Sequence, residues 1–388
     1  MTNNSLEFHR QQFPALANKA YFNYGGQGPI PQAALEAIAR SYKYVQSAGP
    51  FSNAINGWIA QEFSQTRKAI AAELGVADST IALTENVLVG CNIALWGIDW
   101  QPGDRLVVSD CEHPGVIATI NEIQRRFGIE IVTCHLLETL NSGDPVAAVV
   151  QHLQPQTKLV VISHILWNTG QVLPLTEIVQ AGKTACPQVK ILVDAAQSVG
   201  VLPLNLTAIG ADFYAFTGHK WWCGPEGIGS LYVSPQALES LHPTFIGWRG
   251  LAGNSLNWKV SAEKFEISTS ATPLQAGLRA AIAIHHQRGT AEERYQQIKQ
   301  LSQYLWSGLS KIPGIRCLKT SPPEAGLVSF QIAPDPRHQQ LVQFLEGQQI
   351  LVRLIRDPEC VRACVHYFTA PGEIDRLISA VADFNLRK

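Results

Sequence analysis

The most informative segment of the chain runs Phe213-Tyr-Ala-Phe-Thr-Gly-His-Lys-Trp-Trp-Cys-Gly-Pro-Glu-Gly-Ile-Gly-Ser-Leu-Tyr232. It places a single lysine, Lys220, among small and polar residues between two short apolar runs. A lysine amine is a poor nucleophile while protonated, and its ordinary pKa is about 10.4. Burial and nearby cations lower that pKa and free the amine for Schiff-base formation. The segment therefore predicts a reactive lysine on a loop between two buried strands.

A partner for this lysine lies upstream. Asp194 ends the apolar run in Ile191-Leu-Val-Asp-Ala-Ala-Gln-Ser198. Pyridoxal 5'-phosphate (PLP) needs such a pair: a lysine that forms a Schiff base and a carboxylate that keeps the pyridine nitrogen protonated. The two segments together predict an enzyme that carries PLP.

Bulk composition excludes several classes of protein. The chain has 388 residues, 46% hydrophobic and 16% charged, enough to bury a large core over two domains. Its net charge is −1 and it has no basic run, which argues against nucleic acid and anionic membranes as partners. No apolar run reaches the roughly 18 residues of a membrane span.

Targeting and metal signals are equally weak. The N-terminal segment lacks the basic and apolar regions of a secretion signal. The eight cysteines have no paired spacing, so we expect them to stay reduced and the protein to be cytoplasmic. Neither a zinc-ligand spacing nor a nucleotide-binding loop is found, so no metal is expected.

The hydrophobic pattern predicts alternating strands and helices, an α/β, doubly wound fold. Continuous apolar runs such as Lys158-Leu-Val-Val-Ile are typical of strands covered on both faces. The expected strands are 81–84, 105–109, 130–134, 158–163, 190–194, 213–216 and 228–233. The expected helices between and before them are 31–46, 53–74, 87–97, 114–127, 145–153 and 175–185.

The chain divides into an irregular arm over 1–30, a large domain over 31–285 and a smaller α+β domain over 286–388. For the small domain we expect helices at 291–309 and 373–384 and strands at 315–318, 327–332, 349–354 and 361–366. The helices within 31–75 are assigned to the large domain, with packing against the small domain as the alternative.

Polar residues follow the ends of several expected strands, and ligands of open α/β sheets bind beyond those ends. These residues are Thr84, His113, Asn168, Asp194, Gln197, Thr217, His219 and Lys220. Taken singly, His113 and Asp194 also fit helix caps and Lys220 a surface lysine. Their convergence on one edge of one sheet indicates a single site, where the amides that open the helix after Thr84 could hold a phosphate.

These motifs resemble a known family. Asp194-Ala-Ala-Gln-Ser, Thr217-Gly-His-Lys and Gly224-Pro-Glu-Gly-Ile-Gly are similar to the class V aminotransferase group, which includes cysteine desulfurases. Leu166-Trp-Asn-Thr-Gly-Gln and Trp221-Trp-Cys-Gly-Pro-Glu look like its L-cysteine/cystine C–S lyase branch. The resemblance implies a PLP-dependent transferase of fold type I: a large domain with a mixed, mostly parallel sheet and a smaller α+β C-terminal domain.

The resemblance also implies roles for individual residues. Lys220 would form the Schiff base and move the α-proton, and His113 would stack on the pyridine ring. Asp194 would face the ring nitrogen and Gln197 the phenolic oxygen. The implied phosphate contacts are Thr217, His219, the Val87/Leu88 turn and, from a neighbouring subunit, Thr269. Arg353 and Arg362 would clamp the substrate carboxylate, which suits their planar guanidinium groups.

Three departures bear on the reaction. Val87 and Leu88 stand where threonine is usual, so backbone amides alone can serve there. Trp167 replaces a usual asparagine, and its role and that of Asn168 stay open. A desulfurase has a nucleophilic cysteine five residues after the first clamp arginine, where this chain has Pro358. The nearest thiol, Cys360, lies among acids that disfavour a thiolate.

The expected reaction is therefore β-elimination on L-cystine or L-cysteine, giving pyruvate, ammonia and persulfide or sulfide. His113 is a candidate general acid for the departing sulfur, and Cys223 is expected to be part of the wall. The resemblance implies a homodimer with a shared active site, and a sulfur acceptor or iron–sulfur protein as a further partner. The alternatives are a desulfurase with a persulfide on Cys360, an epimerase or aminotransferase of the same fold, and a non-catalytic regulatory or binding protein.

Overall fold

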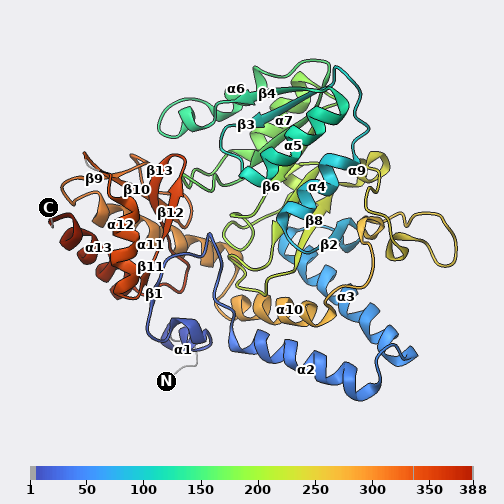
Figure 1. The fold of residues 1–388 in the computed structure, drawn as a ribbon, viewed down its shortest axis with the longest axis horizontal. Helices are drawn as coiled ribbons and strands as arrows, with labels where there is room; N and C mark the ends of the chain where they lie inside the picture. Colours follow the sequence, from blue (N-terminus) through green and yellow to red (C-terminus); the bar gives the residue numbers. More distant parts are fainter. Residues whose placement is uncertain (1–5, 335, 387–388) are drawn as a thin grey trace.

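The computed structural model describes residues 6–334 and 336–386 and shows a large α/β body beside a smaller one (Figure 1). Residues 1–5 of the expected arm, and residues 335 and 387–388 of the expected small domain, lie outside the described residues.

The large body is built on a seven-stranded sheet of order β2-β8-β7-β6-β5-β3-β4. Its strands are β2 (Ile81–Thr84), β3 (Arg105–Ser109), β4 (Glu130–Cys134), β5 (Thr157–Ser163), β6 (Lys190–Asp194), β7 (Phe213–Thr217) and β8 (Gly229–Val233). Strand β8 runs antiparallel to both β2 and β7, and the remaining pairs are parallel. The predicted mixed, mostly parallel sheet is confirmed.

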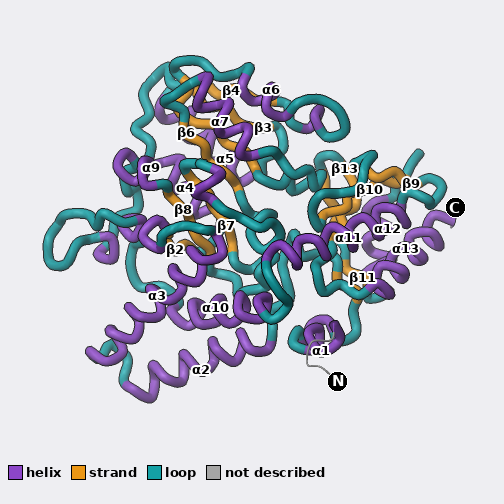
Figure 2. Tube along the Cα trace, turned by 180° about the vertical axis from the view of Figure 1, so that it is seen from behind, coloured by secondary structure: helices purple, strands orange, loops and turns teal. Residues whose placement is uncertain are grey.

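Helices cover both faces of this sheet (Figure 2). The helices of the large body are α2 (Gln32–Ala48), α3 (Asn53–Leu74), α4 (Val87–Gly97), α5 (Pro114–Phe127), α6 (Pro145–Val150), α7 (Leu175–Ala185), α8 (Leu206–Ile209), α9 (Pro235–Ser240) and α10 (Thr272–His286), of which α2 packs on α10 and not on the sheet. Alternation along β3 shows the two layers: Leu106 and Val108 pack with α4 and α5, whereas Val107 packs with α3 and α7. Burial on both faces explains why these strands are apolar throughout.

Local signals fix where the helices begin and end. The Ser52 side chain caps α3 by accepting from the Ile55 amide, and Gly75 ends that helix in the left-handed region at φ +66°. Asn86 caps α4 in the same way through the Val89 amide. Helix α5 begins with Pro114 at its first position and ends at Gly128, also left-handed.

The smaller body has a four-stranded antiparallel sheet of order β12-β13-β10-β9 with three helices against it. Its elements are α11 (Ala291–Leu309), β9 (Ile315–Cys317), β10 (Leu327–Ile332), α12 (His338–Gly347), β12 (Arg353–Arg356), β13 (Glu359–Cys364) and α13 (Pro371–Leu386). Single-turn 3-10 helices lie at Pro14–Leu16, Asp78–Thr80, Leu137–Thr139, Trp248–Gly250 and Ala262–Phe265.

The arm belongs to both bodies. It contains α1 (Leu6–Gln11) and β1 (Ala20–Tyr21), and β1 pairs in parallel with β11 (Ile350–Leu351). The amides of Ala20 and Phe22 bond to the carbonyls of Gln349 and Leu351. The single strand expected over 349–354 is therefore wrong: its first half pairs with the arm and its second half is β12.

Helices α2 and α3 pack against α10 (Figure 1), so they stay with the large sheet, and the alternative of packing on the small domain does not hold. Neither α10 nor α12 was expected from the pattern. Among the described helices, none combines the length and apolar character that a membrane crossing requires.

Candidate active site

Six of the predicted residues line one cavity at the carboxyl edge of the large sheet: Val87, Leu88, His113, Asp194, Gln197 and Lys220. They come from five separate places in the chain, the starts of α4 and α5, the end of β6, the turn after it and the loop after β7. Parallel strands bring their carboxyl ends to one edge, which is why residues so distant in sequence meet here.

The amine of Lys220 is poised for Schiff-base chemistry. Burial lowers its pKa to about 8, Asp194 opposes this shift, and Arg362 adds to it. A substantial fraction of the amine is therefore neutral near pH 8, which an ordinary lysine is not.

Asp194 is a buried carboxyl held at the tip of β6. Burial raises its pKa, while the Ala196 N–H, which donates to Oδ1 at 2.9 Å, and Lys220 oppose the rise. With Oδ1 engaged in this turn, Oδ2 is the oxygen left to accept a bond from a ligand. This arrangement suits a carboxylate that pairs with a cationic ring nitrogen.

His113 caps α5: its Nδ1 accepts the N–H of Gly115 at 3.2 Å. The ring is exposed, and burial of part of it and the charge of Lys220 lower its pKa. The neutral ring therefore carries its proton on Nε2, because Nδ1 is an acceptor. His113 is therefore a helix cap that also lines the cavity, and its stacking on a cofactor ring stays a prediction.

The start of α4 offers two free donors. Asn86 Oδ1 satisfies the Val89 N–H, and the N–H groups of Val87 and Leu88 have no hydrogen bond within the described residues. Free amides and the helix dipole make such an end an anion site. Thr84 does not add to it, because its hydroxyl donates to the Asn86 carbonyl.

Gln197 lines the cavity, but both ends of its amide already bond to the protein. Its Oε1 accepts from Trp221 Nε1 at 2.9 Å, and its Nε2 donates to the Gly25 carbonyl at 2.9 Å. One amide proton is left to reach a ligand.

Three predicted phosphate ligands lie off this cavity. Thr217 and His219 bond to each other, with 2.6 Å between Thr217 Oγ1 and His219 Nδ1. Thr269 lines a second cavity, of about 490 Å³, which shares Leu88 with the first.

The two candidate carboxylate ligands face each other in register across β12 and β13. Arg362 is buried; its Nη1 donates to the Trp167 carbonyl at 2.7 Å, and its Nε has no partner in the described part of the chain. Arg353 is exposed. Asn168, whose role was open, donates from Nδ2 to the carbonyl of Asp357 and so ties the β12–β13 hairpin to the loop after β5.

The comparisons with known proteins agree with this geometry, since the family model described as Aminotransferase class-V matches residues 20–374. The chain belongs to the class-V aminotransferase family.

Within the family, the chain is similar to C-DES, with 49% identity over 96% of this chain and 99% of the other and TM-scores of 0.94 and 0.93 for two structures. One is a lysine-to-alanine mutant with glycine covalently linked to the PLP cofactor; the other is a complex of the cystine C–S lyase with its reaction product cysteine persulfide.

Relatives of lower sequence identity are described as enzymes of other activities. The isopenicillin N epimerase of Streptomyces clavuligerus is 26% identical, over 95% of this chain and 94% of its own. A probable cysteine desulfurase of Vibrio cholerae is 28% identical, over 97% and 98%.

The class-V fold of this chain holds its thiol candidates out of reach. Cys360 is fully buried in β13 beside Leu318 and Ile355, and burial raises its pKa to about 12. Pro358 lies in the turn between β12 and β13. Cys223 is likewise buried, and burial raises its pKa well above the ordinary value. All eight cysteines are buried and unpaired.

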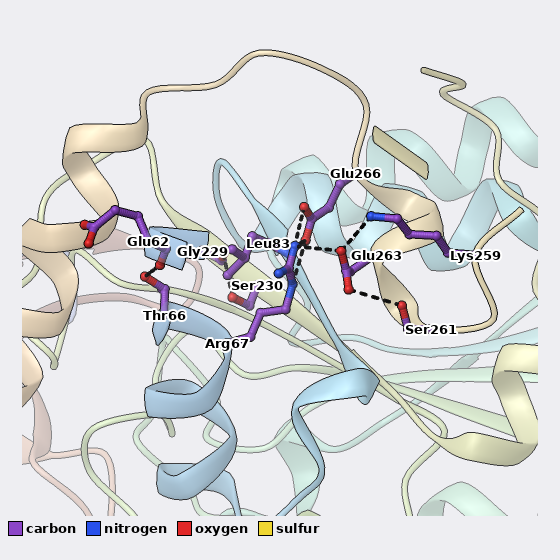
Figure 3. A network of polar contacts seen from close by, with 10 residues as sticks. All are labelled: Glu62, Thr66, Arg67, Leu83, Gly229, Ser230, Lys259, Ser261, Glu263 and Glu266. Atoms are coloured by element: carbon purple, nitrogen blue, oxygen red, sulfur yellow. Dashed lines mark hydrogen bonds and ion pairs between the residues drawn. The ribbon is translucent and has the colours of Figure 1, made fainter. Parts of the chain in front are cut away.

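A buried ion-pair network holds the segment that leads to Thr269 (Figure 3). Arg67 of α3 donates from Nη2 to both carboxylate oxygens of Glu266. Oε1 of Glu266 also accepts the Leu83 N–H at 3.0 Å. Glu263 adds a contact at 3.5 Å to Arg67 and bonds to Lys259. Residues 263–266 are thereby fixed against α3 and β2, which sets the position from which the loop of residues 267–270 starts.

Sequence reasoning missed Glu112. This buried carboxyl accepts from the Ser109 hydroxyl at 2.5 Å and from the Ser163 amide and hydroxyl at 2.8 Å each. Burial and then the charge of Asp194 raise its pKa to about 8. An acid directly before His113, just past a buried strand, was the available signal.

The site as a whole fits PLP. Lys220 supplies the amine, Asp194 Oδ2 can accept from a ring N–H, and the free Val87 and Leu88 amides suit a phosphate. The anion donors and the carboxylate lie on the same cavity as the amine, as a group carrying a phosphate, a basic ring nitrogen and an aldehyde requires.

Proposed function

We propose that the protein is a PLP-dependent carbon–sulfur lyase that acts on L-cystine or L-cysteine by β-elimination. Addition of one water per substrate yields pyruvate and ammonia. From cystine the sulfur leaves as cysteine persulfide, and from cysteine it leaves as sulfide. The observation that carries the proposal is Lys220 beside Asp194 on a cavity while Cys360 is buried away.

When bound, PLP supplies an aldehyde that joins amines and a ring that withdraws electrons. The chain supplies the rest. The neutral Lys220 amine takes the α-proton, and Asp194 Oδ2 holds the proton on the ring nitrogen. The Val87 and Leu88 N–H groups bind the phosphate, and the Arg362 guanidinium binds the substrate carboxylate.

His113 is the donor that we propose for the departing sulfur. Its proton is on Nε2, and Trp167 lies at its edge, with 5.8 Å between the ring centroids. A neutral imidazole whose Nδ1 is fixed by the Gly115 amide can donate a hydrogen bond from Nε2 to the departing sulfur. The proton that the sulfur takes up comes from the Lys220 ammonium that forms when the amine takes the α-proton.

The likeness to the cystine C–S lyase C-DES, at 49% identity, supports lysis over desulfurase chemistry. The buried Cys360 supports it as well, since a persulfide carrier must reach the substrate as a thiolate.

The test is to load the purified protein with PLP, add L-cystine or L-cysteine, and identify the three-carbon product. The proposal expects pyruvate with persulfide or sulfide, unchanged in Cys360→Ser and absent in Lys220→Ala. Alanine as the product, lost in Cys360→Ser, overturns the lyase in favour of a desulfurase. A visible cofactor band that persists in Lys220→Ala overturns the assignment of the lysine.

We also propose a homodimer whose subunits share active sites, with the persulfide passed to a sulfur acceptor such as an iron–sulfur protein. Thr269 follows the anchored segment and lines a cavity together with Trp248. Trp248 belongs to a loop, drawn in gold at the right of Figure 1, that exposes apolar side chains. These are Phe245, Ile246, Trp248, Leu256 and Val260, each more than half exposed. Exposed apolar groups gathered on one loop are typical of an interface.

Complementation tests the shared site. If Thr269 serves the partner's cofactor, Lys220→Ala and Thr269→Ala subunits are each impaired alone, and dimers formed by mixing them regain activity at one of two sites. Light scattering should give twice the chain mass. A monomer, or mixtures no more active than Thr269→Ala alone, contradicts the proposal.

A further inference from the structure

Four consecutive carbonyl groups around the reactive lysine are each held by a donor from elsewhere or from the next turn. The His219 carbonyl accepts the Gly28 amide at 2.7 Å, and the Lys220 carbonyl accepts the Cys223 amide at 3.0 Å. The carbonyls of Trp221 and Trp222 instead accept from imidazoles, His366 Nε2 at 2.9 Å and His285 Nε2 at 2.8 Å.

The two imidazoles belong to a longer chain of buried bonds. His285 Nδ1 lies 2.8 Å from the hydroxyl of Tyr367, and that hydroxyl lies 3.0 Å from His9 Nε2. The Nδ1 of His366 accepts the Tyr367 amide at 3.0 Å. His9, His285, His366 and Tyr367 are all at most 3% exposed.

Only one placement of protons satisfies every bond. A carbonyl can only accept, so Nε2 of both His285 and His366 carries a proton and donates. In the neutral rings Nδ1 must then accept, so the Tyr367 hydroxyl donates to His285. That hydroxyl has its oxygen left for His9, whose Nε2 is the donor.

The surroundings keep the rings neutral. Burial lowers the pKa of His9 to about 4, of His285 to about 3, and of His366 well below the ordinary value. The charged groups that act on these rings are Arg288 and Arg294, which oppose protonation further. Glu373 of α13 is paired with Arg10 of α1.

The chain joins three parts of the fold that are distant in sequence. His9 lies in α1 of the arm, His285 near the end of α10, and His366 and Tyr367 just after β13 of the small domain. Figure 1 shows α1 beside the end of α10, where Gln12 also bonds to Gln287. The loop after Lys220 is the point on which these parts converge.

We propose that His9, Tyr367, His285 and His366 act as positioning residues that fix the loop of Lys220 and so the direction of its amine. The inference rests on the proposed role of Lys220 and adds residues that touch neither cofactor nor substrate. Removal of a donor frees a carbonyl next to Lys220, and the loop loses one of its fixed points. The arm and the small domain thereby set the geometry of the amine.

The variants are chosen to separate positioning from packing. Tyr367→Phe removes one oxygen and breaks the link between His9 and His285. His285→Met removes the donor to Trp222 within a helix, whereas His285→Gln keeps an N–H at the same place. His338→Met is the matched control, because His338 is a buried histidine of the small domain that bonds to Ile332 and Glu359 instead.

The first readout needs no cofactor. In the protein without PLP, amide hydrogen exchange of the Cys223 amide should rise about tenfold or more in Tyr367→Phe and His285→Met. His285→Gln should restore it, and His338→Met should leave it unchanged.

The second readout uses the PLP-loaded protein. The pH midpoint of the visible absorbance band should move by about half a pH unit or more in the same two variants, with kcat lowered and KM retained. If folded Tyr367→Phe or His285→Met matches the wild type in exchange and in midpoint, positioning is overturned and the cluster only packs. If the wild type binds PLP but forms no pyruvate, the proposed lyase fails, while exchange and midpoint still decide the positioning role.

Discussion

Arg362 donates from Nη1 to the carbonyl oxygen of Trp167 at 2.7 Å, which ties β13 of the small domain to the loop that follows β5. The same guanidinium has an unpartnered, buried Nε among the described residues. The bond from Nη1 thus holds the guanidinium in place, and the N–H of Nε is left to donate to a substrate carboxylate.

Arg362→Lys should therefore lower kcat/KM for pyruvate release by about 100-fold, close to 2.7 kcal/mol, because an ammonium cannot bind both groups. Arg353→Lys should cost about tenfold or less, since that side chain is exposed. Both variants should keep the visible band of bound PLP. Equal activity of Arg362→Lys and wild type removes the clamp from the proposal.

Glu112 should make the folded protein less stable as pH rises. Its folded pKa of about 8 lies above the ordinary 4.5, so the folded state keeps a proton that the unfolded state releases. The contribution of Glu112 to the free energy of unfolding is therefore at its maximum below pH 4.5. It falls by up to about 1.4 kcal/mol for each pH unit between pH 4.5 and pH 8. Glu112→Gln keeps the bonds to Ser109 and Ser163 and has no proton to lose.

The measurement is urea denaturation at pH 5, 6.5 and 8. Glu112→Gln should gain stability over wild type as pH rises, and the exposed Glu138→Gln should track wild type throughout. Parallel curves for wild type and Glu112→Gln across the three pH values refute the shifted proton.

Much of the fold could be read from the sequence, because its determinants are local. Continuous apolar runs marked the strands of the large sheet, and residues such as Asn86, Pro114 and Gly128 marked helix ends. The pairing of Asp194 with Lys220 followed as well, since Asp194 ends β6 and Lys220 follows β7, its parallel neighbour.

The remainder depends on partners distant in sequence. The break between β11 and β12 arises because the arm bonds to Gln349 and Leu351, which no pattern within 349–354 reveals. Helix α10 has no clear apolar pattern of its own, because polar residues are among those it buries. Their burial results from the packing of α2 on this helix. His285 and His366 bond to carbonyls of the Lys220 loop, and carbonyls have no sequence signature.

Gly28 should tolerate no side chain. A Cβ there would lie 2.1 Å from the carbonyl oxygen of Lys220, so Gly28→Ala must push the lysine loop aside. We expect PLP affinity to fall about tenfold or more, with the free energy of unfolding lowered by about 1–3 kcal/mol from overpacking.

Gly57→Ala is the control, because nothing lies within 4 Å of a Cβ built there. It should stabilise α3 by about 0.5–1 kcal/mol and leave PLP binding unchanged, as measured by absorbance titration and thermal denaturation. Unaltered PLP binding in Gly28→Ala contradicts the tight approach.

Arg67 and Glu266 provide a stability test that is separate from the chemistry (Figure 3). Arg67→Met leaves the buried Glu266 carboxylate without its cation and should cost about 3–5 kcal/mol at pH 8. Burial already raises the pKa of Glu266 against the effect of Arg67, so without the arginine that pKa rises further. The folded variant then retains a proton at pH values where the unfolded chain has lost it, and its stability recovers as pH falls from 8 to 5.5. Arg67→Met with Glu266→Gln should recover much of the loss at pH 8, because the neutral amide can still accept the Leu83 N–H. Urea denaturation at pH 5.5 and pH 8 gives the free energy of unfolding of the wild type, of Arg67→Met and of the double variant. A loss in Arg67→Met that is the same at pH 5.5 and 8 means that its cause is packing and not the unpaired charge.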